Sequence, residues 1–366
     1  MDLGGVLREL DGLEEYLKIK PLYFDVDKGE FVWLDTRLLP FEEVYRRTSD
    51  YRRVAEAIRS MEIRGAPAIG VSAAFAMALA AIHSRASRYE DLLGELEEAR
   101  RVLASTRPTA FNLFWALDRV MEHARTVEED AEALREAVVR EAFRIYIEDI
   151  RGNIEIGRAG SKLIDDGAKI LTHCNTGALA TAGFGTALGV IRYAWYEGKK
   201  IQVITTETRP VLQGARLNVW ELTKEGIPFK LIVDGAAGLV FRRGMADLAI
   251  VGADRIILTG HTANKIGTYS VALAAWHNGK PFYVAAPTST IQQVKDPGEI
   301  VIEERSPDEV RTVMGKYPIT LDNAPVYNPS FDVTPPELIT AFITERGIVE
   351  RPFEEGFSRI LKGYPA

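Results

Sequence analysis

Residues 169–181 read KILTHCNTGALAT, an apolar run that ends in polar groups and in Cys174, the one cysteine among 366 residues. Comparable apolar runs, each followed by a polar or glycine-containing turn and then a helix-like stretch, occur at residues 201–206, 229–233, 248–251 and 281–285. This alternation predicts a Rossmann-like α/β domain with a parallel sheet, whose ligands bind at the carboxyl ends of the strands. We therefore expect a reactive group at Cys174.

The chain before this sheet has a different pattern. Residues 22–26 and 30–34 alternate as strands do, and helical periodicity follows at residues 51–61, 67–82, 89–104, 108–124 and 129–152. A further helix is predicted at residues 152–166 and a last one at residues 336–346. We expect two domains: residues 1–150, mainly helical with a small β element, and residues 151–366, a Rossmann-like catalytic domain.

Composition excludes several classes of protein. The net charge of -7, without a strongly basic run, argues against a protein that coats nucleic acid. One cysteine excludes an internal disulfide framework, and the start of the chain lacks a signal-peptide pattern, so we expect a cytoplasmic protein. The most apolar run, residues 66–82, contains Pro67 and Gly70 and predicts a buried helix rather than a membrane span. The five histidines lack metal-ligand spacing, so we expect no catalytic metal.

Two arginines each precede a helix that is predicted to start with proline. They are Arg64, in RGAP at residues 64–67, and Arg107, in TRPT at residues 106–109. Free amides at such a helix start attract anions, and a guanidinium beside them can bind phosphate. A surface ion pair or a helix cap is the commoner role for an arginine at such a position.

Cys174 and Asp254 follow different strands at matching places. The thiol would lie just before helix amides that lower its pKa, although a lone cysteine is often a small buried apolar group. The carboxyl group of Asp254 could exchange a proton with a substrate oxygen, or could cap a helix or pair with Arg255.

Gln213, Asn264 and Lys265 follow later strands and could reach the same crevice, where their amide and ammonium groups suit sugar hydroxyls and phosphate. The stretch GFGTALG, at residues 183–189, resembles a dinucleotide fingerprint, but its last spacing is three residues rather than two. We expect it about two turns inside a helix, where its glycines would allow close helix packing rather than NAD binding.

Six motifs together resemble the methylthioribose-1-phosphate isomerase family, which belongs to the superfamily of translation initiation factor 2B subunits. They are RGAPAIG (64–70), THCNTGALAT (172–181), ETRP (207–210), QGARL (213–217), GADR (252–255) and ANKIGT (263–268). The resemblance spans residues 64–290 in order. It implies a mixed amino-terminal domain, a Rossmann-like carboxy-terminal domain and a homodimer.

The resemblance also implies a reaction: the interconversion of 5-methylthioribose 1-phosphate and 5-methylthioribulose 1-phosphate in methionine salvage, without metal or nucleotide. By position, Cys174 matches the catalytic cysteine and Asp254 the proton donor. The positions that match substrate-binding residues are Arg64, Gly65, Ala66, Arg107, Gln213, Asn264 and Lys265. The chain departs from the family pattern at Thr259, Gly260 and His261, where Asn-Gly-Asp is expected, so this loop could shape the pocket differently.

Three alternatives remain at this point. The chain could isomerise 5-deoxyribose 1-phosphate or ribose 1,5-bisphosphate, and the latter needs a second phosphate site. The apolar residues 66–69 and the run 177–181 favour an uncharged thioether at C5. A regulatory subunit related to initiation factor 2B would need no catalysis, and would leave the combination of Cys174, Asp254, Arg107 and Lys265 unexplained.

Overall fold

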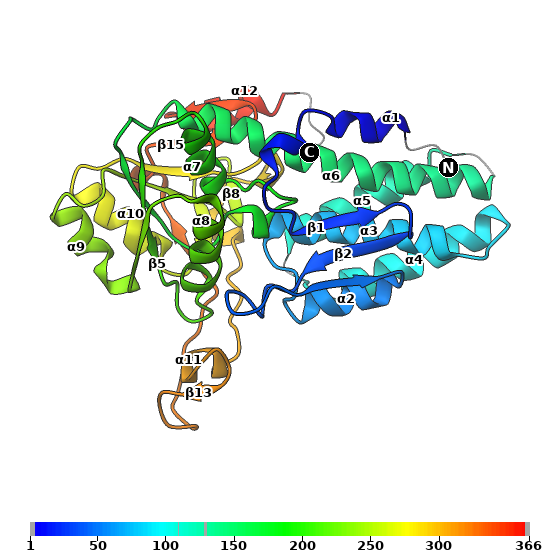
Figure 1. The fold of residues 1–366 in the computed structure, drawn as a ribbon, viewed down its shortest axis with the longest axis horizontal. Coiled ribbons are helices and arrows are strands. Elements are labelled where there is room, and N and C mark those ends of the chain that lie inside the picture. The colour runs from blue at the N-terminus through cyan, green and yellow to red at the C-terminus, as the bar shows by residue number, and fades with distance from the viewer. Residues whose placement is uncertain (1–3, 109, 128–129, 363–366) are drawn as a thin grey trace. The chain divides into compact units, whose positions relative to one another are not determined.

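The computed structural model describes residues 4–108, 110–127 and 130–362 (Figure 1). The chain divides into two compact units, Met1–Gly152 with Ala178–Gly185, and Asn153–Gly177 with Thr186–Ala366. The short segment after Cys174 therefore packs with the first unit. There the ring of Phe184 meets the edge of Tyr16, and the Ala182 amide donates to the Asp149 carboxylate at 2.7 Å. The sequence did not predict that Ala178–Gly185 packs with the first unit.

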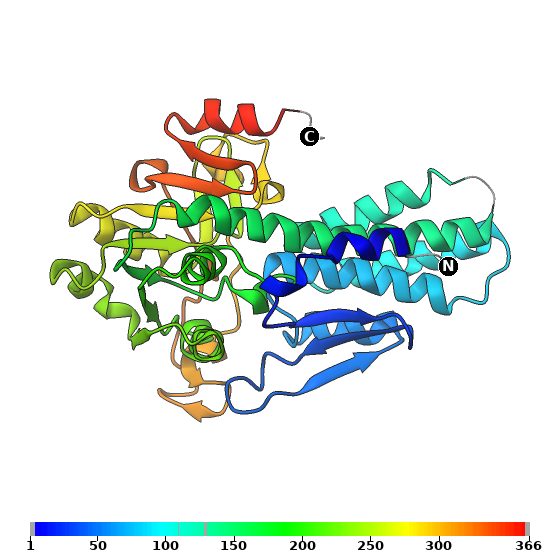
Figure 2. The ribbon, with the colours of Figure 1, turned by 45° about the horizontal axis from the view of Figure 1, so that its top comes forward.

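The first unit combines a small sheet with long helices. Its antiparallel strands are β1 (Leu22–Asp25), β2 (Glu30–Leu34) and β3 (Tyr45–Thr48), after the short turns α1 (Gly4–Leu7), η1 (Arg8–Leu10) and η2 (Glu14–Tyr16). The helices are α2 (Tyr51–Arg59), α3 (Ala66–His83), α4 (Tyr89–Ala104), α5 (Phe111–Ala124) and α6 (Ala131–Ser161). Figure 2 shows the three strands alongside the helices of this unit.

Helix α3 forms the centre of the first unit because its small apolar side chains let α2, α4 and α5 approach it closely. It is long and apolar enough to cross a membrane by length and composition, but 72% of it is buried inside the protein, as in a core helix. The predicted buried helix is confirmed.

A seven-stranded sheet forms the second unit, in the order β16-β15-β10-β7-β4-β5-β6. All neighbours pair in parallel except β15 and β16. The strands are β4 (Lys169–Thr172), β5 (Gln202–Thr206), β6 (Phe229–Ile232), β7 (Leu248–Val251), β10 (Phe282–Ala285), β15 (Ala341–Thr344) and β16 (Gly347–Glu350).

Helices cover both faces of this sheet. One face packs against the end of α6, α7 (Ala187–Tyr196) and α8 (Val219–Glu225), and the other against α9 (Ala237–Arg242), α10 (Thr268–His277) and α12 (Phe353–Ile360). Ile170 and Leu171 show how neighbouring strand residues enter opposite cores. Burial on both faces is why these strands read as continuous apolar runs.

The second unit also contains a four-stranded sheet in the order β11-β8-β9-β14, and its first strand in the sequence comes after β7. Its strands are β8 (Arg255–Ile257), β9 (Thr262–Lys265), β11 (Ile291–Gln292) and β14 (Phe331–Thr334). Helix α11 (Asp308–Arg311) with β12 (Thr312–Val313) and β13 (Tyr317–Pro318) forms a small lobe that projects from this unit, in orange in Figure 1. The remaining short turns are η3 (Ala178–Ala180), η4 (Gly214–Asn218), η5 (Asp234–Ala236), η6 (Thr288–Thr290), η7 (Pro297–Glu299) and η8 (Pro336–Leu338).

Several local predictions were wrong. Helix α6 continues to Ser161 where two helices were predicted, and α5 begins at Phe111 rather than at Pro108. The predicted helix at residues 336–346 is instead η8 followed by β15, because the run AFIT adds a buried strand beside β10.

The glycines at 183 and 185 lie before α7 rather than inside it, both with positive φ. The predicted helix after Val251 is the β8–β9 hairpin.

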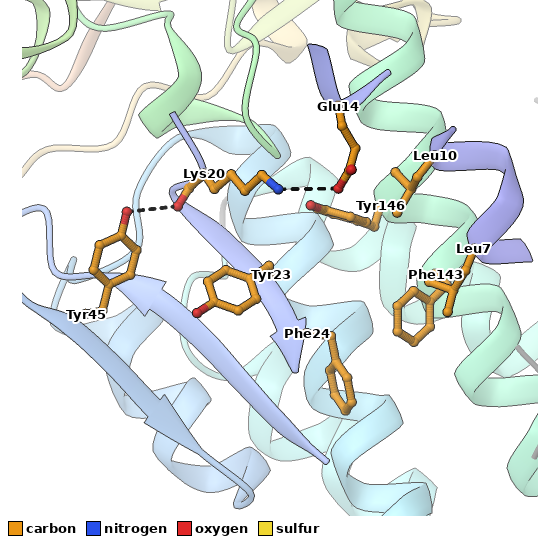
Figure 3. Close-up of a pocket in the computed structure, with 9 residues that line it drawn as sticks. All are labelled: Leu7, Leu10, Glu14, Lys20, Tyr23, Phe24, Tyr45, Phe143 and Tyr146. Carbon is orange, nitrogen blue, oxygen red and sulfur yellow. Dashed lines mark hydrogen bonds and ion pairs between the residues drawn. The ribbon is translucent and has the colours of Figure 1, made fainter. Parts of the chain in front are cut away.

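A pocket of about 490 Å³ lies in the first unit (Figure 3). Its polar groups bond to one another: the Lys20 ammonium lies 3.3 Å from a Glu14 oxygen, and the Tyr45 hydroxyl donates to the Lys20 carbonyl at 3.2 Å. The other lining side chains are apolar or aromatic: Leu7, Leu10, Tyr23, Phe24, Phe143 and Tyr146. None of the residues predicted to act on substrate lines this pocket.

Candidate active site

Cys174 and Asp254 lie at the carboxyl ends of neighbouring strands. Cys174 is the second residue after β4 and Asp254 the third after β7, and β4 pairs with β7 in parallel. Parallel strands end at the same edge of a sheet, so this topology places the thiol and the carboxyl group at one edge. The buried thiol is 5% exposed, whereas Asp254 is half-buried.

The β8–β9 hairpin brings Asn264 and Lys265 to the same edge. The Asp254 amide donates to the Ala263 carbonyl at 3.0 Å, which places the start of β8 beside the end of β9. The Asn264 side chain is buried and donates to the Thr268 hydroxyl at 3.0 Å. The Lys265 ammonium donates to the Ser330 carbonyl at 3.0 Å. The Lys265 charge also acts on the carboxyl groups of Asp332 and Glu309. A lysine ammonium at this edge of the sheet suits an anion.

The loop that departs from the family pattern is the turn of this hairpin, at the opposite end from Lys265. Thr259 and His261 face each other there, with 2.8 Å between the hydroxyl oxygen and Nδ1. The three residues that differ from the family pattern therefore lie away from the edge of the sheet at which Cys174 and Asp254 are placed. Arg255, the alternative partner considered for Asp254, directs its guanidinium to Gln292 and to the Glu299 carbonyl.

Gln213 follows β5, the other neighbour of β4. Its side chain is 6% exposed, and its Oε1 has no hydrogen-bond partner among the described residues. The same holds for the hydroxyls of Thr176, after β4, and Ser330, beside Lys265. Buried polar atoms are nearly always hydrogen-bonded, so these three are candidates to contact a ligand.

Cys174 has a strained backbone held by side chains. Its φ of 61° lies in the left-handed region, which is costly for a residue with a Cβ. The Cys174 backbone amide donates to the Thr208 hydroxyl at 3.0 Å, and the Cys174 carbonyl accepts from the side-chain amide of Asn218 at 2.7 Å. Such strain persists where surrounding contacts over-determine it, typically at functional sites.

Asn218 reaches Cys174 from η4, a π-helical turn. Gly214 begins this turn, and a methyl group there would lie 1.8 Å from the Thr206 carbonyl oxygen, so only glycine permits the approach of η4 to the end of β5. π-Helical turns are rare in proteins overall, and those that occur are often found at functional sites.

A buried ionic network supports this segment. The Asn175 amide donates to Asn218 at 2.9 Å and to Glu221 at 2.8 Å. The Arg192 guanidinium bridges Glu221 at 2.9 Å and Glu225 at 2.8 Å, with all three side chains 3% exposed or less. Burial alone would lower the pKa of Arg192, but the two carboxylates raise it overall, so the guanidinium stays charged.

In the first unit, Arg64, Gly65 and Ala66 lead into α3, with Pro67 in its first turn as predicted. Gly65 has φ 96°, and a methyl group on it would lie 2.5 Å from the Cα of Ala180, so glycine is required. The half-buried Arg107 precedes α5, whose first turn begins after the Pro108 that was expected to start it. Helices α3 and α5 pack against each other, which keeps both segments on neighbouring elements.

Comparison with known proteins identifies the family. The pattern of the initiation factor 2 subunit family matches residues 62–351. A protein of Aeropyrum pernix, provisionally named methylthioribose-1-phosphate isomerase, is 67% identical over 97% of this chain and 97% of its own. The chain belongs to this family, on its methylthioribose-1-phosphate isomerase branch.

Two solved structures of the family share the fold. The crystal structure of 5-methylthioribose 1-phosphate isomerase from Pyrococcus horikoshii OT3 is 42% identical, covers 95% of this chain and 98% of its own, and superposes with a TM-score of 0.89. A structure named as the delta subunit of initiation factor eIF-2B from A. fulgidus is 41% identical, covers 94% and 99%, and superposes with a TM-score of 0.85. The predicted fold class and family resemblance are confirmed.

The isomerase fold corrects one argument about Cys174. Helix α7 does not begin until Ala187, so the thiol does not lie before helix amides as the sequence suggested. The polar environment of Cys174 comes instead from Thr208 and Asn218. Among the described residues, no three His, Cys, Asp or Glu side chains lie close enough to hold a metal ion, and a metal-free reaction stays a prediction.

Sequence analysis of this isomerase missed the residues that hold Cys174. A signal was present for the ionic network, because Arg192 interrupts the apolar helix ALGVIRYAWY and Glu221 and Glu225 lie one turn apart in α8. Thr208 lies in the ETRP motif, which by itself assigns the residue no role, and no signal distinguishes Asn218 from ordinary polar residues.

Proposed function

We propose that this protein is an aldose–ketose isomerase that interconverts 5-methylthioribose 1-phosphate and 5-methylthioribulose 1-phosphate in methionine salvage. The observation that carries the proposal is the strained, buried Cys174 at the same sheet edge as Asp254. The family membership supports it. Strained residues held by several contacts are typical of functional sites, and a protein that only binds a partner does not need a thiol held at this edge of the sheet.

The reaction explains why these two groups are needed. The phosphate on the anomeric carbon prevents the sugar from opening as a free aldose does, so ring opening needs a proton on the ring oxygen. We assign this proton transfer to Asp254 and the chemistry at C2 to Cys174. Hydrogen then moves from C2 to C1, by an enolate or a hydride route, with no net gain or loss of atoms. A crevice that excludes water protects the phosphate-bearing intermediate.

We assign substrate binding in the second unit to Gln213, Asn264 and Lys265. The Gln213 oxygen, which has no hydrogen-bond partner among the described residues, suits a sugar hydroxyl, and the Lys265 ammonium suits the phosphate. The binding roles of Arg64, Gly65, Ala66 and Arg107 stay predictions, as do the cytoplasmic location and the absence of nucleic acid and membrane partners.

The proposal is tested by incubating the purified protein with 5-methylthioribose 1-phosphate and following the sugar carbons by NMR. We expect the anomeric signal to be replaced by a ketone signal while the phosphate remains attached. If the wild-type protein left the aldose unchanged, the isomerase assignment would be wrong and a regulatory role would be favoured.

We also propose a homodimer, formed by an apolar surface on the second unit. Tyr269, Leu273 and Trp276 lie at helical spacing on α10 and are 41%, 42% and 58% exposed, and Leu239 of the adjacent α9 is 52% exposed. Near them β6 is the last strand on its side of the sheet. An apolar surface of this kind buries itself when it meets its own copy across a two-fold axis.

The dimer proposal predicts that Trp276→Glu produces monomers in sedimentation velocity at concentrations where the wild type is a dimer. Val301→Glu is the control, because Val301 is 76% exposed and lies outside this surface. A dimeric Trp276→Glu protein, or a monomeric wild type, would exclude this interface.

A further inference from the structure

We propose that Thr208, Thr206 and His173 are positioning residues that form a one-directional hydrogen-bond chain from the Cys174 amide to the Ile266 carbonyl. This hydrogen-bond chain holds the backbone of Cys174 in its left-handed conformation and connects it to the turn after Lys265. The inference rests on the proposed function, because it assumes that the position of the Cys174 thiol matters for turnover.

The direction of the chain follows from its ends. The His173 Nε2 lies 2.8 Å from the Ile266 carbonyl, which can only accept, so Nε2 carries the proton. Nδ1 is then an acceptor and receives the Thr206 hydroxyl proton at 2.7 Å. The Thr208 hydroxyl has two acceptors, the Thr206 hydroxyl oxygen at 3.1 Å and the Thr206 carbonyl at 3.5 Å, and we assign its proton to the nearer one. The Thr208 oxygen is left to accept from the Cys174 amide at 3.0 Å.

Every link therefore donates once and accepts once, and none of the three side chains can reach water. Their exposed fractions are 1% for His173 and 0% for both threonines. The buried ring is held neutral, since burial lowers the pKa of His173 despite the accepting Ile266 carbonyl. Each hydrogen bond orients the donor of the next one. Removal of one hydroxyl therefore leaves the neighbouring polar groups without a hydrogen-bond partner and away from water.

Thr208 is itself strained and separately anchored. Its φ of 62° is a marked outlier for a β-branched residue. The Asp234 carboxylate accepts from the Thr208 amide and from the Arg209 amide, both at 2.7 Å. One hydrogen bond thus connects two strained residues, Cys174 and Thr208. The backbone amide of Thr208 is held in addition by the Asp234 carboxylate. This arrangement fixes the acceptor before Cys174 binds to it.

The far end of the chain lies at the substrate-binding strand. Ile266 directly follows Lys265, and Gly267 packs so closely on the His173 ring that a methyl group there would lie 2.9 Å from Cε1. Asp332 accepts from the Gly267 amide at 2.7 Å and holds the turn from the other side. His173 therefore sets the distance between the cysteine segment and the end of β9.

Thr208→Val tests the chain, because valine keeps the shape of threonine and removes only the hydroxyl. Cys174 is the only cysteine, so its rate of alkylation by iodoacetamide reports on this thiol alone and needs no turnover. We expect the variant to change the alkylation rate about tenfold or more and to lower kcat by about 10- to 100-fold, with KM changed by less than about threefold. Thr208→Ser, which restores the hydroxyl, should recover most of both.

Thr334→Val is the matched control, since Thr334 is also fully buried in the second unit but pairs with Thr262, at the end of β9 that lies away from Lys265. It should change neither readout. If Thr208→Val does not fold by circular dichroism, Thr206→Val breaks the same chain one link farther away and should give the same two changes. Wild-type alkylation and kcat in a folded Thr208→Val or Thr206→Val protein would overturn the inference. A wild type without isomerase activity would refute the proposed function instead, while the alkylation rates would still test the chain.

Discussion

Replacement of Cys174 by serine is expected to lower kcat by about 10²- to 10⁴-fold, the range for a group that acts on the reacting atoms. The fold should survive, because the contacts of Cys174 with Thr208 and Asn218 use backbone atoms that serine also provides. Steady-state assays on folded protein measure the effect, and calorimetry with substrate should show nearly unchanged binding.

Asp254→Asn is the companion variant and should produce a similar loss. It keeps the size of the side chain and the hydrogen bond from the backbone amide of residue 254 to the Ala263 carbonyl, while removing the acidic proton. Near-wild-type turnover in either variant would show that the replaced residue takes no part in the chemical step.

The second large effect concerns stability. Arg192→Met is expected to lower the free energy of unfolding by about 3 to 5 kcal/mol, because it leaves the carboxylates of Glu221 and Glu225 buried without a cation. Since Glu221 also holds Asn175, loosening of the cysteine segment should follow. Urea denaturation of the variant, with the same slope as the wild type, measures the loss.

An exposed ion pair of the same unit supplies the control. Lys295 and Glu354 are paired at the surface, with side chains 62% and 47% exposed. Lys295→Met should cost about 0 to 1 kcal/mol, since solvent screens such pairs. A loss for Arg192→Met no larger than that of Lys295→Met would show that burial of the Arg192 network carries no net stabilisation.

The sequence predicted strands where burial leaves a clear pattern, including β4, β5, β6, β7 and β10 of the central sheet, and missed β15 and β16. Strands β2 and β7 and helix α4 have the predicted bounds, because apolar runs and helical periodicity there reflect local packing. The β8–β9 hairpin was missed, since the short strands after Val251 lack the length and alternation that mark a strand. The long loop from His173 to Thr186 was missed because its polar groups, such as the Asn175 side chain, bond to residues distant in the sequence instead of forming a local helix.

The same limit applies to the site. Cys174 and Asp254 were predicted because strand ends are visible in sequence, and their roles and those of the binding residues came from the family resemblance. The residues that contact the Cys174 backbone could not be predicted, because Thr208 and Asn218 lie 34 and 44 positions from Cys174 in the sequence and are brought to it by the fold. The hydrogen-bonded direction of His173 likewise depends on Ile266, 93 positions away.

The central claim is isomerisation of a ribose 1-phosphate with an uncharged thioether at C5, and one measurement tests it most directly. The wild-type protein is assayed with three ribose 1-phosphates that carry methylthio, hydrogen or phosphate at C5, and kcat/KM is compared. We predict ketose formation from all substrates that bind, with the methylthio compound highest and the bisphosphate lowest. A bisphosphate converted fastest, or no ketose from any of the three, would contradict the account.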